Sequence, residues 1–349
     1  YSNKFKHYNN IPGNPNSLSN NWVWCLYTDS EGIVWIGTRR GGLNRFDPRT
    51  ETFKNFRNNP NDRTTIIDNS IGYVFEDRKS NLWVGTNNGL NRFNRSTETF
   101  ERYYPEQEDD RNIVNGTIMS IVEDLDNNLW LGTYGGGLIK LDLNSIQQNE
   151  LSFTRYIHNP EDSNSINLNR INTLLIDSFG SLWIGTDVGG LDKYLPESES
   201  FQHYYERESG LDVILCIHED KAGRFWVGTY NGGLNLLNRA TGEREIFSTK
   251  DGLPHHTIKD ILEDDKGNLW LSTERGISKF NYEEKSIRNY TVSEGLQAGF
   301  FHMRAATMGL NGEMYFGGIN GFNRFHPKDL IDNPFQPDVM ISDIKLFDK

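Results

Sequence analysis

The sequence is poor in cysteine, in long apolar runs and in basic charge. No apolar stretch is long enough to cross a bilayer. The formal net charge of −12 leaves Lys and Arg scattered among a larger number of acids, so we expect no contact with nucleic acid. The two cysteines, Cys25 and Cys216, each lie ten residues before a tryptophan, and we expect buried free thiols rather than a disulfide. No signal peptide is visible at Tyr1, which indicates a mature product or a piece of a longer chain.

Aromatic residues and glycine, by contrast, are plentiful. Aromatics make up 12% of the chain and there are 33 glycines, which favours a β-rich protein over a helical or membrane one. A motif of Trp, an aliphatic residue, Gly and Thr recurs, with one Ser variant and one worn copy. Its copies begin at Trp35, Trp83, Trp130, Trp183, Trp226, Trp270 and Tyr315. Steps of 43 to 53 residues separate them, which is the length expected of a β-propeller blade.

The residues around each copy predict a four-stranded antiparallel blade. An Asp stands six residues before the Trp in six copies and a Gly three before it in five, as in Asp29 and Gly32, which is typical of a type I turn. An aliphatic or Met residue twelve before the Trp, from Val23 to Met303, marks an apolar run that predicts a buried inner strand. After the Trp strand, Gly-Leu or a close variant opens a third strand, and an aromatic segment such as 53–56 supplies the fourth.

The ends of the chain predict how the ring closes. The seventh copy lacks a fourth strand, and the segment 5–8 has the fourth-strand pattern ahead of the first copy. We therefore expect an all-β, seven-bladed propeller over residues 1–333, closed by this N-terminal strand, which would leave no sheet edge exposed. Residues 334–349 predict a linker and the first strand of a following β-sandwich domain.

The blade signature and the spacer Asn14-Pro-Asn-Ser-Leu-Ser19 resemble the two-component regulator propeller repeats of the periplasmic sensor region in Bacteroidetes hybrid two-component histidine kinases. The resemblance implies two consecutive propellers, of which this chain is the second, then a three-tyrosine β-sandwich, a membrane helix and a kinase. It implies a periplasmic location within an inner-membrane protein, a homodimer of the full-length protein, and contacts with the upstream propeller and downstream sandwich. It also implies a sensor that detects oligosaccharides and controls transcription of glycan-utilisation genes, with no enzyme activity and no cofactor in this fragment.

Function is expected where the copies disagree, because a residue repeated in every blade serves packing or turning. The variable positions are the connection between the second and third strands and the entrance to the inner strand, which we expect at one mouth of a central channel. Aromatic faces suit sugar rings, and Arg suits carboxylates and hydroxyls. The candidate ligand-binding residues are Trp22, Trp24, Arg39, Arg40, Tyr134, Arg170, Tyr230, His255, Arg275, His302 and Arg304. Of these, Trp22, Arg170 and His302 are expected at one shared repeat position.

Other interpretations stay open from the sequence. The rim residues would then be merely solvated, and Trp22 and Trp24 would pack the closing blade. A second alternative is a protein-interaction propeller. A third is a carbohydrate-active enzyme, which needs two carboxylates facing each other, and the connecting loops offer only Asp187 and Glu274. No metal site is expected at His255 and its neighbour, because Cys or acidic residues at ligand spacing are missing. The rim arginines hint at an acidic ligand.

Overall fold

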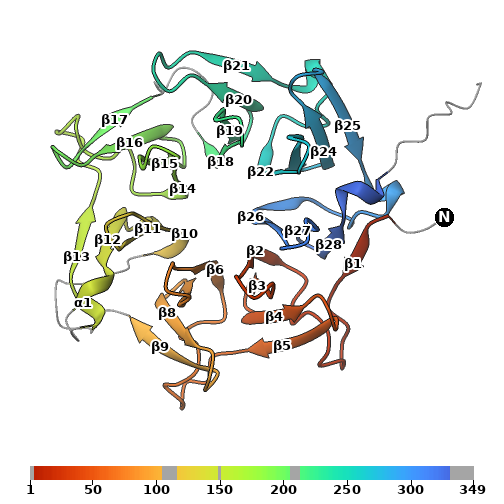
Figure 1. Cartoon of the computed structure of the whole chain (residues 1–349). Helices are drawn as coiled ribbons and strands as arrows, with labels where there is room; N and C mark the ends of the chain where they lie inside the picture. Colours follow the sequence, from red (N-terminus) through yellow and green to blue (C-terminus); the bar gives the residue numbers. More distant parts are fainter. Residues whose placement is uncertain (1–3, 104–115, 148–150, 205–212, 331–349) are drawn as a thin grey trace, which may run out of the picture.

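Seven four-stranded antiparallel sheets stand around a common axis, as Figure 1 shows. The computed structural model describes residues 4–103, 116–147, 151–204 and 213–330. Each sheet is one blade with its strands in chain order from the axis outward, except that the seventh takes its outermost strand from the N-terminal segment. The predicted seven-bladed all-β propeller is therefore confirmed. The expected linker and strand at 334–349 lie outside the described residues.

The strands fall into four sets by their place in the blade. The inner strands are β2 (Val23–Thr28), β6 (Ile71–Glu76), β10 (Thr117–Glu123), β14 (Ile171–Ile176), β18 (Ile214–Glu219), β22 (Ile258–Glu263) and β26 (Phe301–Met308). The second strands are β3 (Val34–Thr38), β7 (Leu82–Thr86), β11 (Asn128–Tyr134), β15 (Leu182–Thr186), β19 (Phe225–Thr229), β23 (Leu269–Thr273) and β27 (Met314–Gly318). The third strands are β4 (Leu43–Asp47), β8 (Gly89–Asn94), β12 (Leu138–Asp142), β16 (Leu191–Leu195), β20 (Leu234–Leu237), β24 (Gly276–Asn281) and β28 (Gly321–Phe325). The outer strands are β5 (Thr52–Phe56), β9 (Thr99–Tyr103), β13 (Phe153–Tyr156), β17 (Ser200–His203), β21 (Arg244–Phe247), β25 (Ser286–Tyr290) and β1 (Lys6–Tyr8).

Short helices occupy a few connections. The α-helix α1 (Leu143–Gln147) joins the third and fourth strands of blade three. Three 3₁₀ helices follow outer or third strands, at η2 (Thr249–Asp251), η3 (Val292–Glu294) and η4 (Pro327–Asp329). No helix in the described part of the chain is long and apolar enough to cross a membrane.

The repeated Asp and Trp form one local unit in six blades. In blade one, Asp29 Oδ1 accepts the backbone N–H groups of Glu31 and Ile33 at 3.0 and 2.9 Å, which closes the turn as expected. Its Oδ2 accepts the indole N–H of Trp35 at 2.7 Å. The same indole–carboxylate bond recurs at 2.8 to 2.9 Å in blades two to six. The Asp thus accepts a hydrogen bond from the buried Trp and also closes the turn.

The repeated Gly is required by the neighbouring blade. A Cβ added to Gly132 would lie 2.6 Å from Ile171 Cγ2 of the next inner strand, far inside van der Waals contact. The same clash recurs around the ring, and at its closure a Cβ on Gly317 would lie 2.5 Å from Val23 Cγ1. In blades one to six the apolar residue twelve before the Trp therefore packs against the glycine of the preceding blade, and the contact closes the ring from blade seven to blade one.

A second contact between blades comes from glutamates at the ends of inner strands. Glu76 accepts the backbone N–H of Ser30 in the preceding blade's turn at 2.6 Å. Three equivalent bonds, of 2.6 to 2.9 Å, are made by Glu123, Glu219 and Glu263. The sequence signal for this hydrogen bond is a Glu seven residues before the Trp in these four blades. These neighbouring blades are therefore joined by hydrogen bonds at their turns as well as by apolar packing.

The N-terminal strand completes blade seven, as predicted. β1 pairs antiparallel with β28, with Lys6 opposite Arg324 and Tyr8 opposite Phe322. Just ahead of it, Phe5 is fully buried, with its ring centroid 4.8 Å from that of Phe325. Because strands from both ends of the described chain share one sheet, the ring is closed by hydrogen bonds as well as by packing.

The inner strand of blade seven departs from the repeat. In the other blades one residue bulges between the first two paired positions, as between Val23 and Cys25. In β26 the paired positions are Phe301 and Ala306, so the bulge is wider. The prediction that Met303 takes the place of Val23 was therefore wrong, because Phe301 pairs where Val23 does. Counting back from the Trp fails here, since residues inserted in a bulge change the spacing without changing the pairing.

Candidate functional site

The loops between second and third strands meet the starts of the inner strands on one face, which we call the mouth face. Arg39 N–H donates to Trp22 O at 3.0 Å, and Asp187 N–H donates to Arg170 O at 2.9 Å. In blade seven the equivalent bond runs from Ile319 N–H to Phe300 O at 3.3 Å. The two variable sets that sequence comparison singled out therefore lie together. His302, expected at the position of Trp22 and Arg170, instead lies two residues further along, within the wide bulge, and Phe300 takes that position.

Blade one contributes an aromatic and cationic cluster to the mouth face. The Arg39 guanidinium lies 4.3 Å from the Trp22 ring centroid and 5.9 Å from that of Trp24. Trp24 in turn stacks on His302 of blade seven, with ring centroids 6.2 Å apart. Both indole N–H groups are buried and have no acceptor among the described residues. Arg40 is exposed, with a positive φ of 63° that turns the loop.

Blades three and four form a second cluster. Tyr134 O–H donates to Asp187 Oδ2 at 3.1 Å, and Arg170 Nη1 lies 3.5 Å from the same oxygen. The Arg170 guanidinium also lies 5.7 Å from the Tyr134 ring centroid. Tyr134 remains 41% exposed, so its ring face is available to a ligand. The Asp187 carboxylate is thereby engaged by its own neighbours.

Blades five to seven form a third cluster around a residue that sequence comparison missed. The Lys259 ammonium is 3.1 Å from Glu274 Oε1 and lies 5.6 and 5.8 Å from the ring centroids of Tyr230 and Phe300. His255 Nε2 is 3.6 Å from the other oxygen of Glu274. Lys259 stands eleven residues before the Trp, in register with Trp24 by counting, and that alignment was the available signal.

Arg275 lines a surface groove beside the third cluster. The groove has a volume of about 450 Å³ and is walled by Phe300, Val292 and Leu296 together with Glu274. It lies between blades six and seven on the mouth face, close enough to Lys259 to extend the third cluster outward. Its mixed apolar and charged walls suit an amphipathic ligand such as a sugar.

Arg304 lies deeper, at the axis of the ring. Its Nη1 donates to Met119 O at 3.3 Å and lies 2.8 Å from Met119 Sδ, although blades three and seven are not neighbours. Only 7% of Arg304 is exposed, and burial lowers its pKa to about 10. His302, beside it in the bulge, has a pKa lowered to about 3, chiefly by burial and then by the Arg304 charge, so it is neutral at neutral pH.

The inner strands also carry a carboxyl group with an unusual pKa. Burial raises the pKa of Asp260 to about 7, against hydrogen bonds from the backbone N–H groups of Ile261, Ala306 and Arg304 that favour the charged form. Ile261 N–H donates to Asp260 Oδ1 at 3.0 Å. Asp260 therefore holds the backbone of the blade seven bulge, and through it the position of the Arg304 side chain.

The two cysteines lie in inner strands, as expected for buried free thiols. Cys25 and Cys216 are both buried and unpaired. Burial raises the pKa of Cys25 to about 12 and that of Cys216 well above its usual value. Each Sγ fills the space beside the repeated glycine of its own blade. Their role is packing.

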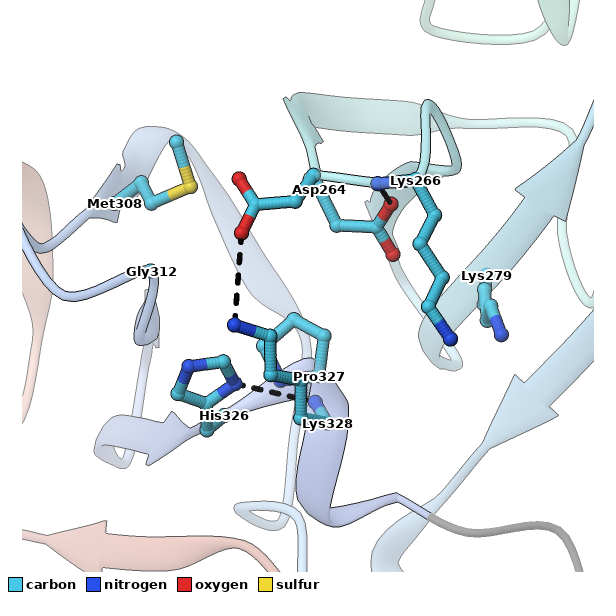
Figure 2. Close-up of a pocket in the computed structure, with 9 residues that line it drawn as sticks. Asp264, Lys266, Lys279, Met308, Gly312, His326, Pro327 and Lys328 are labelled. Atoms are coloured by element: carbon cyan, nitrogen blue, oxygen red, sulfur yellow. Dashed lines mark hydrogen bonds and ion pairs between the residues drawn. The ribbon is translucent and has the colours of Figure 1, made fainter.

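Neither metal ligation nor a small cavity elsewhere on the propeller points to the mouth face. Among the described residues, no group of three or more His, Cys, Asp or Glu side chains is arranged to hold a metal. A small cavity of about 40 Å³ lies between blades six and seven on the opposite face, which carries the Asp turns (Figure 2). Lys328 bridges it toward Asp265 at 3.7 Å, and Lys328 N–H donates to His326 Nδ1. That volume suits a water molecule or two and excludes a sugar ring.

Comparison with protein families matches several of the repeats. The model described as a two-component regulator propeller matches residues 17–40, 65–88, 165–188, 209–231 and 252–275. These segments contain the Trp motifs of blades one, two, four, five and six, and each covers the region from the inner strand to the mouth loop.

A curated relative and solved structures agree with this match. The histidine kinase P4 of Formosa agariphila is 29% identical over 220 residues, which is 61% of this chain and 16% of that protein. The extracellular domain of a putative hybrid two component system from B. thetaiotaomicron is 27% identical, with a TM-score of 0.79 over 93% of this chain and 41% of that one. A streptogramin B lyase shares the fold alone, at 14% identity and a TM-score of 0.69, over 92% of this chain and 96% of that one.

The chain thus spans less than half the length of the two-component relatives that it matches. Its repeats, its blade geometry and these relatives agree: the chain is a β-propeller that contains two-component regulator propeller repeats and is similar to the extracellular domain of a hybrid two component system.

Proposed function

We propose that this propeller is part of the periplasmic ligand-sensing region of a hybrid two-component histidine kinase, and that it detects an oligosaccharide at the mouth face. The observation that carries the proposal is the blade one cluster, where two buried indole N–H groups beside the Arg39 guanidinium have no acceptor among the described residues. Sugar hydroxyls accept such hydrogen bonds while their ring faces stack on aromatic side chains.

The three clusters support a site that spans several blades. Trp22, Tyr134 and Tyr230 each present an aromatic face with a cation held within 6 Å of the ring centroid. Because these faces lie on blades one, three and five, a ligand longer than one sugar unit is required to contact more than one of them. The remaining candidates, Arg40 and Arg275, lie on the exposed loops of the same face.

Signalling follows from a change in how this propeller sits against its neighbours in the longer protein. A ligand that binds one arrangement of the domains more tightly shifts the population toward that arrangement, by as much as its differential affinity allows. The shift passes to a downstream β-sandwich and a membrane helix, and so to the kinase and to transcription of glycan-utilisation genes. The upstream propeller and a second protomer are the expected partners.

The face that carries the Asp turns offers a surface for one of these partner domains. Leu125 and Phe179 are each 79% exposed on the adjacent turns of blades three and four. The position seven before Trp183, which would supply the Glu for the blade three turn, is Ile176, whereas the Ser178 N–H of the blade four turn donates to Glu219. Apolar turns in place of polar ones favour contact with another folded domain.

Calorimetric titration of this chain and of the longer sensor region against neutral and acidic oligosaccharides tests the proposal, with product formation followed in parallel. We expect saturable binding without turnover, weakened at least tenfold by Trp24→Ala or Arg39→Ala and unchanged by Arg63→Ala, an exposed control. Turnover of any sugar would assign the mouth face to an enzyme. If neither protein binds any oligosaccharide of the panel, a protein-interaction propeller would be favoured instead.

A further inference from the structure

We propose that Arg304 forms an anion subsite at the propeller axis, below the mouth face, and that the group it binds is the carboxylate of an acidic sugar unit. The inference rests on the oligosaccharide ligand proposed above and adds its chemical class. It is carried by three buried hydrogen-bond donors, Trp22 Nε1, Trp24 Nε1 and Arg304 Nε, none of which has an acceptor among the described residues.

The Arg304 guanidinium is buried, and its charge is only partly offset. It forms no ion pair with any described carboxylate, and Nη1 is the nitrogen that finds an acceptor, at Met119. Nε, on the edge that it shares with Nη2, has no acceptor among the described residues. That edge presents two parallel N–H groups, the geometry that a carboxylate accepts in bidentate fashion. Burying an unpaired cation is costly, and a bound anion would remove that cost.

The nearest carboxyl group is committed elsewhere. Asp260 accepts the backbone N–H groups of Ile261, Arg304 and Ala306, so its oxygens shape the bulge rather than pair with the guanidinium. Burial also raises its pKa to about 7, which leaves it partly neutral at neutral pH. Asp260 therefore positions Arg304 and only partly offsets its charge.

The surroundings of Arg304 supply further donors. Trp24 lies on β2, which adjoins β26, and its ring stacks on His302 of the bulge that carries Arg304. Trp22 and Trp24 share the guanidinium of Arg39. Three donor groups that have no acceptor among the described residues, at Trp22 just before β2, on β2 and on β26, call for a ligand group that only accepts hydrogen bonds. A carboxylate does, whereas a neutral hydroxyl leaves the cation uncompensated.

The residues around Arg304 keep part of their surface exposed. Trp22, Trp24 and His302 are each partly exposed, although Arg304 below them is nearly covered. A saccharide held by the mouth clusters can therefore direct one carboxylate inward between the Trp24 and His302 rings and the axis. The neutral part of the ligand would stay with the aromatic faces of the mouth.

Galacturonate trisaccharide and its methyl ester form a matched pair of probes, because esterification removes the charge and keeps the sugar. We expect the acid to bind the wild-type chain at least tenfold more tightly than the ester. Arg304→Met, which retains a long apolar stem, should remove that preference and leave binding of the ester unchanged. Arg63→Met, an exposed control, should leave both affinities unchanged.

A second readout follows the Arg304 Nε–H resonance by ¹⁵N NMR, assigned through the loss of its signal in Arg304→Met. The galacturonate monosaccharide should shift it, and its methyl ester should not. Equal shifts with acetate would show that Arg304 binds small anions in general. A response to sulfated sugars alone would show that the bound group is a sulfate and not a carboxylate. Either result overturns the inference, as does an unmoved resonance. Binding of neutral oligosaccharides, monitored by tryptophan fluorescence, would then still support the proposed function.

Discussion

Arg304 and Met119 touch across the axis of the ring. The two residues are 185 positions apart, on blades three and seven, and Arg304 Nη1 lies 3.3 Å from Met119 O. Since these blades are not neighbours, the contact exists only in the closed ring. The wide bulge of β26 makes it, because the added residues carry the Arg304 backbone, with a φ of 63°, toward the axis.

The Asp and Trp unit is expected to be essential in each blade that has it. Asp177 Oδ2 accepts the indole N–H of Trp183 at 2.8 Å and Arg239 Nη1 at 3.0 Å. Asp177→Ala leaves the buried Trp183 indole N–H without its acceptor and removes one of the two carboxylates that pair with Arg239, which keeps Glu219 at 2.8 Å. We expect a loss of about 3 kcal/mol in the free energy of unfolding. Urea denaturation measures it. Asp126→Ala removes an exposed side chain from another turn of this face and should change stability by less than about 0.5 kcal/mol.

The packing of the repeated glycine against the next blade can be tested by a paired substitution. Gly132→Ala should cost about 1 to 3 kcal/mol, because the new Cβ would lie 2.6 Å from Ile171 Cγ2. In an Ile171→Ala background that methyl group is absent, and the added cost of Gly132→Ala should be much smaller. Thermal unfolding of the four proteins gives the coupling between the two sites. Equal costs in both backgrounds would show that blade three does not depend on this contact.

Closure of the ring depends on the first described residues. Phe5 is fully buried against Tyr290 and Phe325, with ring centroids 5.4 and 4.8 Å apart. Phe5→Ala should therefore lower stability by about 3 to 5 kcal/mol. Phe179→Ala is the matched control, because that ring is 79% exposed, and its cost should stay below about 1 kcal/mol. Similar effects for the two variants would argue against closure by the N-terminal segment.

Asp260 should make stability depend on pH. Its folded-state pKa, about 7, lies above the usual 3.8, so the folded protein binds the extra proton between these values. Its contribution to stability therefore falls as pH rises from about 4 to 7 and is constant above. Asp260→Asn cannot titrate, and its stability relative to wild type should rise by on the order of 2 kcal/mol between pH 5 and pH 8.

Comparing the two proteins at each pH cancels the other titrating groups. Asn is close to Asp in shape and keeps an acceptor for the backbone N–H of Ile261. Thermal unfolding at several pH values supplies the measurement. Parallel pH profiles for wild type and Asp260→Asn would mean that solvent at the axis already restores the ordinary pKa of this carboxyl group.

The sequence predicted the blades because their determinants are local or strictly periodic. Asp29 closes a turn over four residues and binds Trp35 six residues away, so the same spacing in each copy implies the same unit. The fourth-strand pattern at 5–8 could be matched to the missing strand of blade seven for the same reason. The mouth loops followed, since strand order places them beside the inner-strand entrances.

Counting residues back from each Trp could not predict how deep the individual side chains at the mouth lie or where they point. His302 and Arg304 were both placed at the entrance to an inner strand, yet the wide bulge puts Arg304 at the axis and gives the entrance position to Phe300. Lys259 was overlooked, although it joins Tyr230, Phe300 and Glu274. Whether the candidates that lie together bind a ligand stays a prediction.

By itself, the sequence determined the number of blades, their strands and the way the ring closes, because hydrogen bonds in turns and the packing of Gly against the next blade repeat at fixed intervals. Only the tertiary structure decided which side chains share the mouth and the axis. Met119 and Arg304 are in contact because the closed ring brings blades three and seven close together at the axis. The bulge in β26 then decides that Arg304 is the residue that reaches across. No periodic pattern encodes either effect, since both depend on where a break in the period falls on the ring.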